Sequence, residues 1–442
     1  MAIRLSDHFT YTRLLRFTVP SIIMMIFTSV YGVVDGFFVS NFAGKTAFAA
    51  VNLIMPFLMI FGALGFMVGT GGSALVSKTL GEGQRERASG LFSLLIWLSL
   101  AVGAVLAVLG VVFMRPIAAL LGAEGQMLED CVTYGCILQM ALPAFILQNE
   151  FQSFLITAER PKLGLWVTVG AGLTNVVLDA LFVGVFGWGI QGAAWATVTS
   201  QLVGGVLPLV WFLLPNGSCL RLTRPVMDGR ALVKTLTNGS SEMMTNLSMS
   251  VVNMLYNFQL MSLAGENGVS AYGAIMYVNF IFIAVFIGYS IGVGPVISFH
   301  YGAGSTHELK SLYKKSLRLV GGASLGMLLL AELLADPLAR LFVGYDVQLL
   351  DMTRRAFILY FLALLPTGVN IFGSSFFTAL NDGLVSAVIS FLRSMVFQVA
   401  AVLLLPLVLG LDGVWLSILV AEGLALAVTM FCFVIFRKKY QY

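Results

Sequence analysis

The chain has 442 residues, of which 59% are hydrophobic and only 10% are charged, and its formal net charge is +4. A soluble globular domain carries about 25% charged residues, so a soluble fold could not bury this much apolar surface. The excess of Lys and Arg over Asp and Glu is small and is spread over short polar segments. This distribution suits a protein whose orientation in a lipid bilayer is set by the charges of its loops, and it argues against nucleic-acid binding. The four cysteines show no C-x-x-C spacing, which argues against a disulfide framework.

Long apolar runs account for most of the chain, and a run of about 20 residues can cross the hydrocarbon core of a bilayer. The first run contains Pro20 and Asp35 and is too long for the core of a signal peptide, so we expect it to remain as a membrane helix. Charged, Gly, Pro and Asn residues separate the runs into spans, which in chain order are 14–40, 49–77, 89–113, 131–157, 163–185, 190–214, 235–263, 270–299, 316–334, 354–379, 385–409 and 413–436. The predicted fold class is an all-α membrane protein with twelve transmembrane helices.

Positive charge alternates between the segments that join these spans. If the N-terminus is cytoplasmic, the cytoplasmic segments hold 19 of the 25 Lys and Arg residues and the outer segments hold 5. This imbalance follows the positive-inside rule. We therefore expect a multi-pass protein of the bacterial inner (plasma) membrane with both termini in the cytoplasm.

The chain repeats itself with an offset of 221 residues, half its length. Aligned pairs include Gly44 with Gly265, Gly81 with Gly302, Gly192 with Gly413 and Gln201 with Glu422, and Pro143 matches Pro366 after a two-residue slip. Six helices in each half make the repeat parallel, about an axis along the membrane normal. We expect an N-terminal lobe at 1–214, a cytoplasmic connector at 215–234 and a C-terminal lobe at 235–442. Two such pseudo-symmetric lobes suit a transporter that works by alternating access. A channel or a membrane enzyme has less need of two lobes.

Polar side chains in the N-terminal lobe form the main candidate site. Asp35 has Tyr31 one turn before it in the first span. Asp179 has Asn175 one turn before it in the fifth span, and Thr197 lies in the sixth span among small residues that permit close helix approach. Two carboxylates in one pocket of low dielectric would bind a proton or a cation, whose occupancy can bias a two-state transporter. We call these five residues the polar set.

The repeat makes the polar set asymmetric. The offset pairs Asp35 with Tyr256, Asn175 with Val396, Asp179 with Ala400 and Thr197 with Ile418. A purely architectural need should be met in both halves, so the difference favours a functional site in the N-terminal lobe. The alternative is that the two acids only cap or cross-link helices and that the neutral residues hydrogen-bond between helices.

A second group of candidates is more ambiguous. Glu242 could bind a cation or a cationic substrate, or it could be a first-turn acid that the helix dipole favours. Glu150 lies well inside the fourth span and is equally open. Met254, Tyr256 and Met276 belong to a methionine-rich and aromatic stretch that suits varied lipophilic cations, although ordinary packing explains such residues as well.

The sequence carries no pattern for catalysis or for a cofactor. The three histidines do not cluster, and the chain has neither a P-loop nor a nucleophile–base set. We therefore expect a protein that is not an enzyme and that uses no cofactor, with H⁺ or Na⁺ as its coupling ion and no other metal.

Several stretches resemble the MATE (multidrug and toxic compound extrusion) family of transporters. These stretches are 175–179 with 189–197 in helices 5 and 6, Pro20 with Asp35 in helix 1, and 80–83 after helix 2. Two further stretches, 150–154 and 241–246, resemble the bacterial MepA/DinF-like branch of the family. The resemblance covers essentially the whole chain. It implies export of small amphiphilic or cationic substrates, driven by inward H⁺ or Na⁺ through alternating access, with the cation bound at the polar set. We expect a monomer, because the predicted fold is self-contained.

The resemblance also leaves alternatives open. Family members with a cation site in the C-terminal lobe carry acids in helices 7 and 10, and Glu242 could be the first of these, but the tenth predicted span has no acid. A lipid-linked saccharide flippase of the same superfamily would line its cavity with basic residues that hold phosphates, whereas Arg393 is the one basic residue that lies well inside a span here. A passive channel is the remaining alternative.

Overall fold

The computed structural model describes residues 3–344 and 346–442, and every regular element in that part of the chain is helical. The elements, where η marks a short π-helical turn, are α1 (Tyr11–Phe38), η1 (Val39–Ala43), α2 (Lys45–Gly81), α3 (Arg85–Leu120), α4 (Gly125–Met140), α5 (Leu142–Thr157), α6 (Pro161–Asp179), η2 (Ala180–Val185), α7 (Gly189–Leu213), α8 (Gly229–Gly302), α9 (Thr306–Val343), α10 (Val347–Phe361), α11 (Leu364–Ala379), α12 (Gly383–Phe391), η3 (Leu392–Phe397), α13 (Gln398–Leu409) and α14 (Leu411–Tyr440). The predicted all-α class is confirmed.

Nine helical stretches of the described chain are long and apolar enough to cross a membrane. One of them, α8, has 74 residues and is broken at Gly265, whose φ of 60° is not helical, so its two arms form separate spans. Two bent pairs add one span each, α4 with α5 at 60° and α10 with α11 at 45°. With the arms of α8 counted separately, the described residues hold the twelve predicted spans.

The two bends fall near prolines that the repeat relates. Pro143 is the second residue of α5, and Pro366 is the third residue of α11. Proline lacks a backbone N–H and clashes with the turn before it, so a helix ends or bends there. The predicted spans at 131–157 and 354–379 are therefore present, each as a bent pair of helices.

The helix α8 begins earlier than the sequence predicts. Its first residue is Gly229, inside the connector predicted at 215–234. The Asp228 side chain accepts hydrogen bonds from the backbone N–H groups of Arg230 at 3.0 Å and Ala231 at 3.1 Å. This N-cap stabilises a polar first turn that the search for apolar runs missed.

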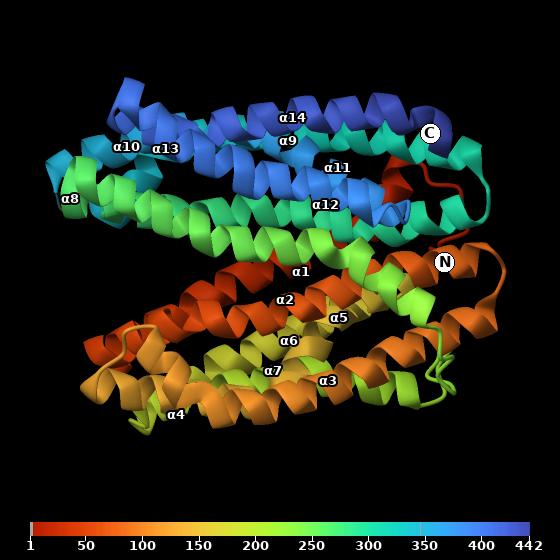
Figure 1. Cartoon of the computed structure of the whole chain (residues 1–442), viewed down its shortest axis with the longest axis horizontal. Coiled ribbons are helices and arrows are strands. Elements are labelled where there is room, and N and C mark those ends of the chain that lie inside the picture. Colours follow the sequence, from red (N-terminus) through yellow and green to blue (C-terminus); the bar gives the residue numbers. More distant parts are fainter. Residues whose placement is uncertain (1–2, 345) are drawn as a thin grey trace.

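The helices form two halves that lie side by side (Figure 1). Elements α1 to α7 make the N-terminal half, and α8 to α14 make the C-terminal half. Both chain ends lie at the same end of the molecule, together with the connections from α2 to α3, from α7 to α8 and from α8 to α9. We call this end the terminal face.

The closest contacts between the halves lie toward the terminal face, where α1 and α2 pack against α8. A Cβ atom added at Gly239 of α8 would lie 1.8 Å from the carbonyl oxygen of Met67, and one added at Gly71 of α2 would lie 2.1 Å from that of Thr235. The backbones therefore touch, and only glycine fits. We call Gly71, Gly81, Gly239 and Gly302 the glycine seam.

Residues 3–10 cross the terminal face and contact both halves. The backbone N–H of Leu5 donates to Oε1 of Glu159, just after α5, at 2.8 Å. Phe9 is fully buried, and its carbonyl oxygen accepts a hydrogen bond from Nζ of Lys315, on α9, at 2.6 Å. This segment and the glycine seam together close the terminal face.

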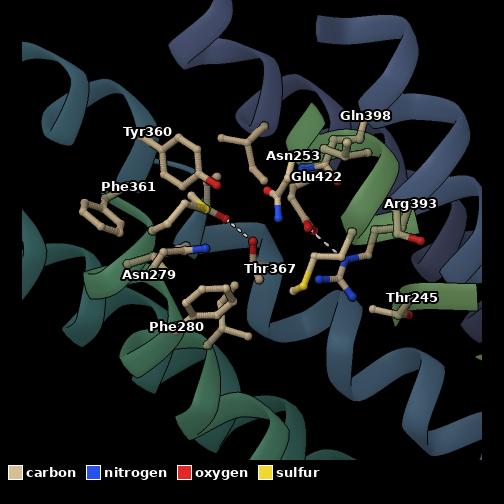
Figure 2. Close-up of a pocket in the computed structure, with 18 of the residues that line it drawn as sticks. Thr245, Asn253, Asn279, Phe280, Tyr360, Phe361, Thr367, Arg393, Gln398 and Glu422 are labelled. Carbon is tan, nitrogen blue, oxygen red and sulfur yellow. Dashed lines mark hydrogen bonds and ion pairs between the residues drawn. The ribbon is translucent and has the colours of Figure 1, made fainter. Parts of the chain in front are cut away.

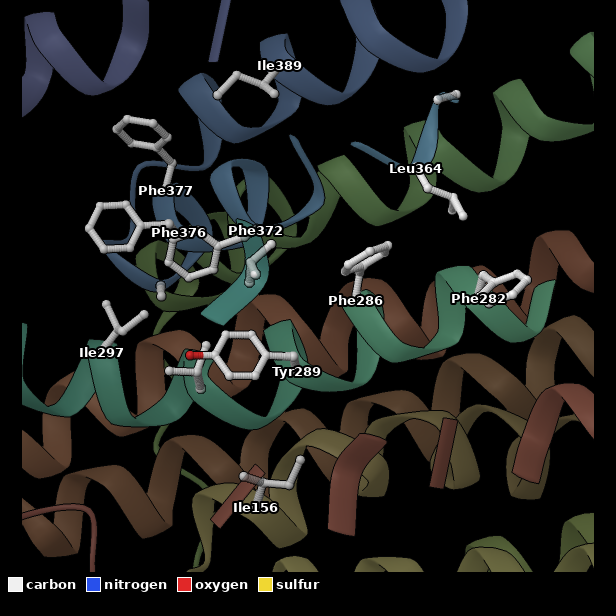
Figure 3. Close-up of a cluster of buried hydrophobic side chains, with 14 of the residues drawn as sticks. Ile156, Phe282, Phe286, Tyr289, Ile297, Leu364, Phe372, Phe376, Phe377 and Ile389 are labelled. Carbon is white, nitrogen blue, oxygen red and sulfur yellow. The ribbon is translucent and has the colours of Figure 1, made fainter. Parts of the chain in front are cut away.

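Aromatic packing fixes the second arm of α8 against α11 (Figure 3). Phe282, Phe286 and Tyr289 lie along α8, and Phe372 and Phe376 lie on α11 within the same buried cluster. The Tyr289 and Phe372 ring centroids are 6.4 Å apart. Between helices in a membrane such contacts stabilise the fold through van der Waals packing. These two helices are therefore firm walls for the cavities beside them.

Candidate functional site

A cavity of about 860 Å³ lies inside the N-terminal half, between α1, α2, α4, α5, α6 and α7. We call it the N-cavity. Four members of the polar set line it, namely Tyr31, Asp35, Asn175 and Thr197. The fifth, Asp179, is fully buried directly behind this wall. The structure thus brings together side chains that lie up to 166 positions apart in the sequence.

The two acids of the polar set meet inside the half. The Asp35 carboxyl faces the Asp179 carboxyl and the Asn175 amide. Oδ1 of Asp35 and both carboxyl oxygens of Asp179 are buried and have no hydrogen-bond donor among the described residues. Two carboxylates that face each other without a donor for their buried oxygens repel each other and are poorly solvated. The arrangement therefore fits a shared proton or a bound monovalent cation.

Both acids lie next to a π-helical turn. The turn η1 begins four residues after Asp35, and η2 begins directly after Asp179. A π-helical turn interrupts the regular i to i−4 hydrogen bonds and is frequent at functional sites. These turns give α1 and α6 a local weakness where the two acids meet, which sequence periodicity does not reveal.

The neutral members of the polar set connect α6 to α7. Nδ2 of Asn175 donates to Oγ1 of Thr197 at 3.4 Å, and the Ser200 hydroxyl donates to the carbonyl oxygen of Ala171 at 2.7 Å. These contacts are interhelical hydrogen bonds, as expected if the neutral residues only link helices. Asn175 and Thr197 nevertheless line the N-cavity as well, so the two interpretations are compatible.

Four further polar residues surround the N-cavity that sequence reasoning did not select. Tyr134 is fully buried near the two acids, and its hydroxyl has no hydrogen-bond partner among the described residues. Gln139, Gln148 and Gln201 line the cavity, and the side-chain oxygen of each has no hydrogen-bond partner among the described residues. A signal existed for Gln201, because the repeat aligns it with Glu422. The cavity therefore offers neutral oxygen and hydroxyl groups around the acid pair.

A second cavity of about 730 Å³ lies in the C-terminal half (Figure 2). We call it the C-cavity. The 221-residue offset relates its lining to that of the N-cavity at Thr28 and Met249, Tyr31 and Val252, Gly32 and Asn253, Met55 and Met276, Leu58 and Asn279, Met59 and Phe280, Thr197 and Ile418, and Gln201 and Glu422. The two cavities are therefore equivalent parts of the two repeats.

The C-cavity contains a buried ion pair. Nε of Arg393 donates to Oε1 of Glu422 at 2.8 Å, and the two side chains are 13% and 5% exposed. Oε2 of Glu422 accepts a hydrogen bond from Nδ2 of Asn370 at 2.7 Å. Arg393, the basic residue well inside a predicted span, is therefore paired with an acid. The sequence analysis noted Glu422 only as the repeat partner of Gln201, and the structure gives it both partners.

A third cavity, of about 880 Å³, lies between the halves, and we call it the interface cavity. It adjoins the C-cavity, because Thr245, Met249 and Arg393 line both. Glu242 lines it as well. Glu242 is the fourteenth residue of α8, well beyond the first turn, so the first-turn interpretation was wrong.

The remaining candidates are dispersed. Glu150 is fully buried in α5, with both carboxyl oxygens unpaired among the described residues. Tyr256 is fully buried and stacks on Tyr272 with ring centroids 4.9 Å apart. Met276 lines the C-cavity, but Met254 is 68% exposed and lines none of the three cavities. Met254 therefore lies on the outer surface of α8, where packing or lipid contact accounts for it.

Comparison with known proteins identifies the family. The MatE family model matches residues 20–181 and 243–404, two equal segments that follow the internal repeat. "Multidrug export protein MepA" of Staphylococcus aureus (strain MSSA476) is 20% identical over 97% of this chain and 94% of its own. The protein of the same name from Staphylococcus haemolyticus (strain JCSC1435) is 21% identical over 95% and 92%.

Solved structures share the fold. A crystal structure of MATE in complex with MaL6 has a TM-score of 0.93 at 23% identity and covers 98% of both chains. The outward-facing conformation of a multidrug resistance MATE family transporter of the MOP superfamily has a TM-score of 0.92 at 23% identity, over 98% of this chain and 97% of the other. These likenesses concern the fold, and the matches of the family model cover most of the sequence. The chain belongs to the MatE family, the MATE proteins that its motifs resemble.

Proposed function

We propose that the protein is a secondary active exporter of small amphiphilic or cationic compounds, driven by inward H⁺ or Na⁺ through alternating access. The observation that carries the proposal is the pair of Asp35 and Asp179, which face each other beside the N-cavity and whose three buried carboxyl oxygens have no hydrogen-bond donor among the described residues. The printed names of the MepA relatives, which are multidrug export proteins, support the substrate class. The coupling ion is the only cofactor that the proposal requires.

The contacts of α1 suggest how ion binding drives the transport cycle. A proton or cation at Asp35 removes the repulsion from Asp179 and lets α1 pack closer to α6. The same helix packs against α8 of the other half, where Ser29 Oγ donates to the carbonyl oxygen of Phe280 at 3.4 Å. A change at the acid pair thus reaches the surface where the halves meet, and its binding free energy can favour one state of the transporter.

The closed terminal face fits one state of such a cycle. We assign the terminal face to the cytoplasm, because the excess of Lys and Arg lies in its segments. The described structure is then the state closed toward the cytoplasm, held by the glycine seam and by residues 3–10. Opening toward the cytoplasm requires these contacts to break.

Transport in liposomes tests the proposal. Efflux of a fluorescent lipophilic cation is followed under an imposed pH gradient or an imposed Na⁺ gradient. Asp35→Asn and Asp179→Asn keep the side-chain size and remove the charge, and Asp351→Asn is the matched control because Asp351 is exposed. We expect gradient-driven efflux that both site variants lose and the control keeps, and the effective gradient names the ion. Unchanged efflux by both site variants would refute the proposal.

A flippase for lipid-linked saccharides is the weaker candidate. Such a substrate presents phosphates that several basic side chains would hold. Among the described residues that line the three cavities, Arg393 is the one basic side chain. One arginine that is already paired with Glu422 leaves little capacity for a diphosphate. Transfer of a labelled polyprenyl-phosphate saccharide across the same liposomes, without any ion gradient, would reverse this ranking.

A further inference from the structure

The ion pair of the C-cavity engages only one of the three guanidinium nitrogens of Arg393. Only Nε of Arg393 has an acceptor within the described chain, and Nη1 and Nη2 have none. The guanidinium points into the cavity, toward the wall that carries Thr367 and Asn279 (Figure 2). A guanidinium presents its N–H groups as a planar fork that matches a carboxylate. The cavity therefore holds a fixed cationic donor with an open face.

Glu422 positions this donor and does not compete for its open face. Its Oε1 holds Nε of Arg393, and its Oε2 is occupied by Asn370. The carboxylate is therefore anchored on both sides. The second acid near Arg393 is Glu242, which lines the interface cavity and has no described side-chain hydrogen bond to Arg393. Nη1 and Nη2 remain available to a group that enters the cavity.

The rest of the wall is suited to an apolar body. Met249, Met276, Phe280, Tyr360 and Phe361 line the same cavity. Aromatic and methionine side chains form adaptable surfaces for flat or irregular apolar groups.

The equivalent cavity of the other half has the opposite character. The 221-residue offset places Gly172 at the position of Arg393. A Cβ atom at Gly172 would lie 2.5 Å from the Phe27 ring and 2.9 Å from the Tyr31 ring, so no arginine fits there. The N-cavity instead has the acids Asp35 and Asp179. One repeat thus carries unpaired acids and the other an arginine with unused donors.

We propose that the C-cavity is a second ligand site, which takes amphiphiles that carry a carboxylate and holds that carboxylate on Nη1 and Nη2 of Arg393. This inference deepens the proposed function, and it rests on that function for the view that the bound amphiphile is a transported substrate. The N-cavity binds the coupling cation, and the C-cavity recognises the anionic group of the substrate. Glu422 is a positioning residue that keeps the guanidinium in place.

Binding of two matched dyes tests the site without any ion gradient. Rhodamine 110 carries a free carboxylate, and rhodamine 123 is its methyl ester, so the two differ in that group. Fluorescence anisotropy gives both dissociation constants on the full chain in lipid nanodiscs. We expect the parent protein to bind rhodamine 110 more tightly. The double variant Arg393→Gln/Glu422→Gln should weaken binding of rhodamine 110 by about tenfold or more and leave rhodamine 123 nearly unchanged, because a hydrogen bond to a charged group contributes about 1.5–3 kcal/mol.

The double variant removes both charges of the Arg393–Glu422 pair together, so neither partner is left charged alone, and we expect the fold to be retained. The control Arg355→Gln/Asp412→Asn removes an ion pair that is largely exposed, with side chains 69% and 34% exposed, and should keep the preference. Size-exclusion profiles of all variants establish that the fold is intact.

Three outcomes separate the inference from the proposed function. If the parent binds both dyes equally, or if the double variant keeps the parent preference, the carboxylate site is refuted. If the preference depends on Arg393 while no ion gradient drives efflux, the site stands and the exporter proposal fails. Asp35→Asn should lose efflux but keep the dye preference, because Asp35 lies in the other cavity.

Discussion

Gly81 and Gly302, which the internal repeat relates, contact each other's helices reciprocally at the terminal face. A Cβ atom at Gly81 would lie 2.0 Å from the carbonyl oxygen of Phe299, and one at Gly302 would lie 2.1 Å from the carbonyl oxygen of Lys78. The second arm of α8 and the end of α2 therefore meet backbone to backbone. A side chain at either position must separate the two halves.

Gly302→Ala should shift the protein toward a state that is open at the terminal face. The added methyl cannot fit against Lys78, whereas a state with separated halves accommodates it. Glu86 and Lys310 are exposed on opposite halves. Spin labels at these two positions, in a variant that lacks the native cysteines, report the separation of the halves by double electron–electron resonance. We expect a longer distance, or a new long-distance population, in the variant.

Gly294→Ala is the matched control. Gly294 lies on the same arm of α8, and a Cβ atom there meets no atom within 4 Å. Its label distances should equal those of the parent. If Gly302→Ala and Gly294→Ala gave the same distances, the seam would not govern closure of the terminal face.

Asp179→Asn should stabilise the protein while it abolishes coupling. The amide can donate a hydrogen bond to Asp35 where the parent has two facing carboxyl groups without a described donor. Replacing this repulsion by a hydrogen bond is worth about 1–3 kcal/mol. Thermal unfolding in detergent at low Na⁺ measures the effect, and the exposed Asp351→Asn should leave the melting temperature unchanged. A lower melting temperature for Asp179→Asn would show that the acid stabilises the fold.

Two ion pairs of the C-terminal half should differ strongly in their contribution to stability. Arg393→Gln leaves Glu422 charged and only 5% exposed, and the loss of one partner of a buried pair costs about 3–5 kcal/mol. Arg355→Gln disrupts the largely exposed pair with Asp412 and should cost less than about 1 kcal/mol. Chemical unfolding curves of the two variants give the comparison. Equal losses would contradict the burial of the first pair.

Acid should abolish the contribution of Asp382, which caps α12 at the terminal face. Burial acts to raise the pKa of Asp382, but hydrogen bonds from Tyr440 and Lys439 outweigh it and hold this pKa below its ordinary value. A carboxyl whose pKa is lower in the folded state stabilises the fold above its ordinary pKa and loses this effect as the pH falls through the folded value. Asp382→Asn should therefore cost about 1–2 kcal/mol at pH 7.

The difference in stability between the parent and Asp382→Asn should shrink below about pH 4, the ordinary range of an aspartate pKa. Tyr440→Phe should show a smaller difference with the same pH dependence, because it removes one of the donors and leaves the cap intact. A difference that stays constant down to pH 3 would mean that Asp382 acts only as a neutral cap.

The twelve spans and the polar set follow from the sequence because both depend on local or repeated patterns. Long apolar runs must be helices in a membrane, since each backbone polar group needs an internal partner. The repeat shows that Asp35 and Asp179 have no acidic equivalents, and this asymmetry predicts a site in one half. The structure adds that the two carboxyls face each other beside a cavity.

Features that depend on contact between distant helices could not be predicted in the same way. Arg393 and Glu422 lie 29 positions apart on different helices, and nothing in their spacing predicts a pair. Tyr134 occurs in an ordinary apolar run, and only packing places its hydroxyl near the acids. The bend before Pro143 was missed because hydropathy is continuous across it. Side-chain geometry decides each of these features, and hydropathy does not encode it.

The course of residues 3–10 offers a way to time the opening of the molecule. Leu5 and Phe9 are 1% and 0% exposed, and each is held by a hydrogen bond to a different half. Chymotrypsin cleaves after such side chains only when they leave their pockets, so the cleavage rate follows the population of opened molecules. The first few residues therefore report the open population of the terminal face, and a ligand that favours the open state should raise the cleavage rate, whereas one that favours the closed state should lower it.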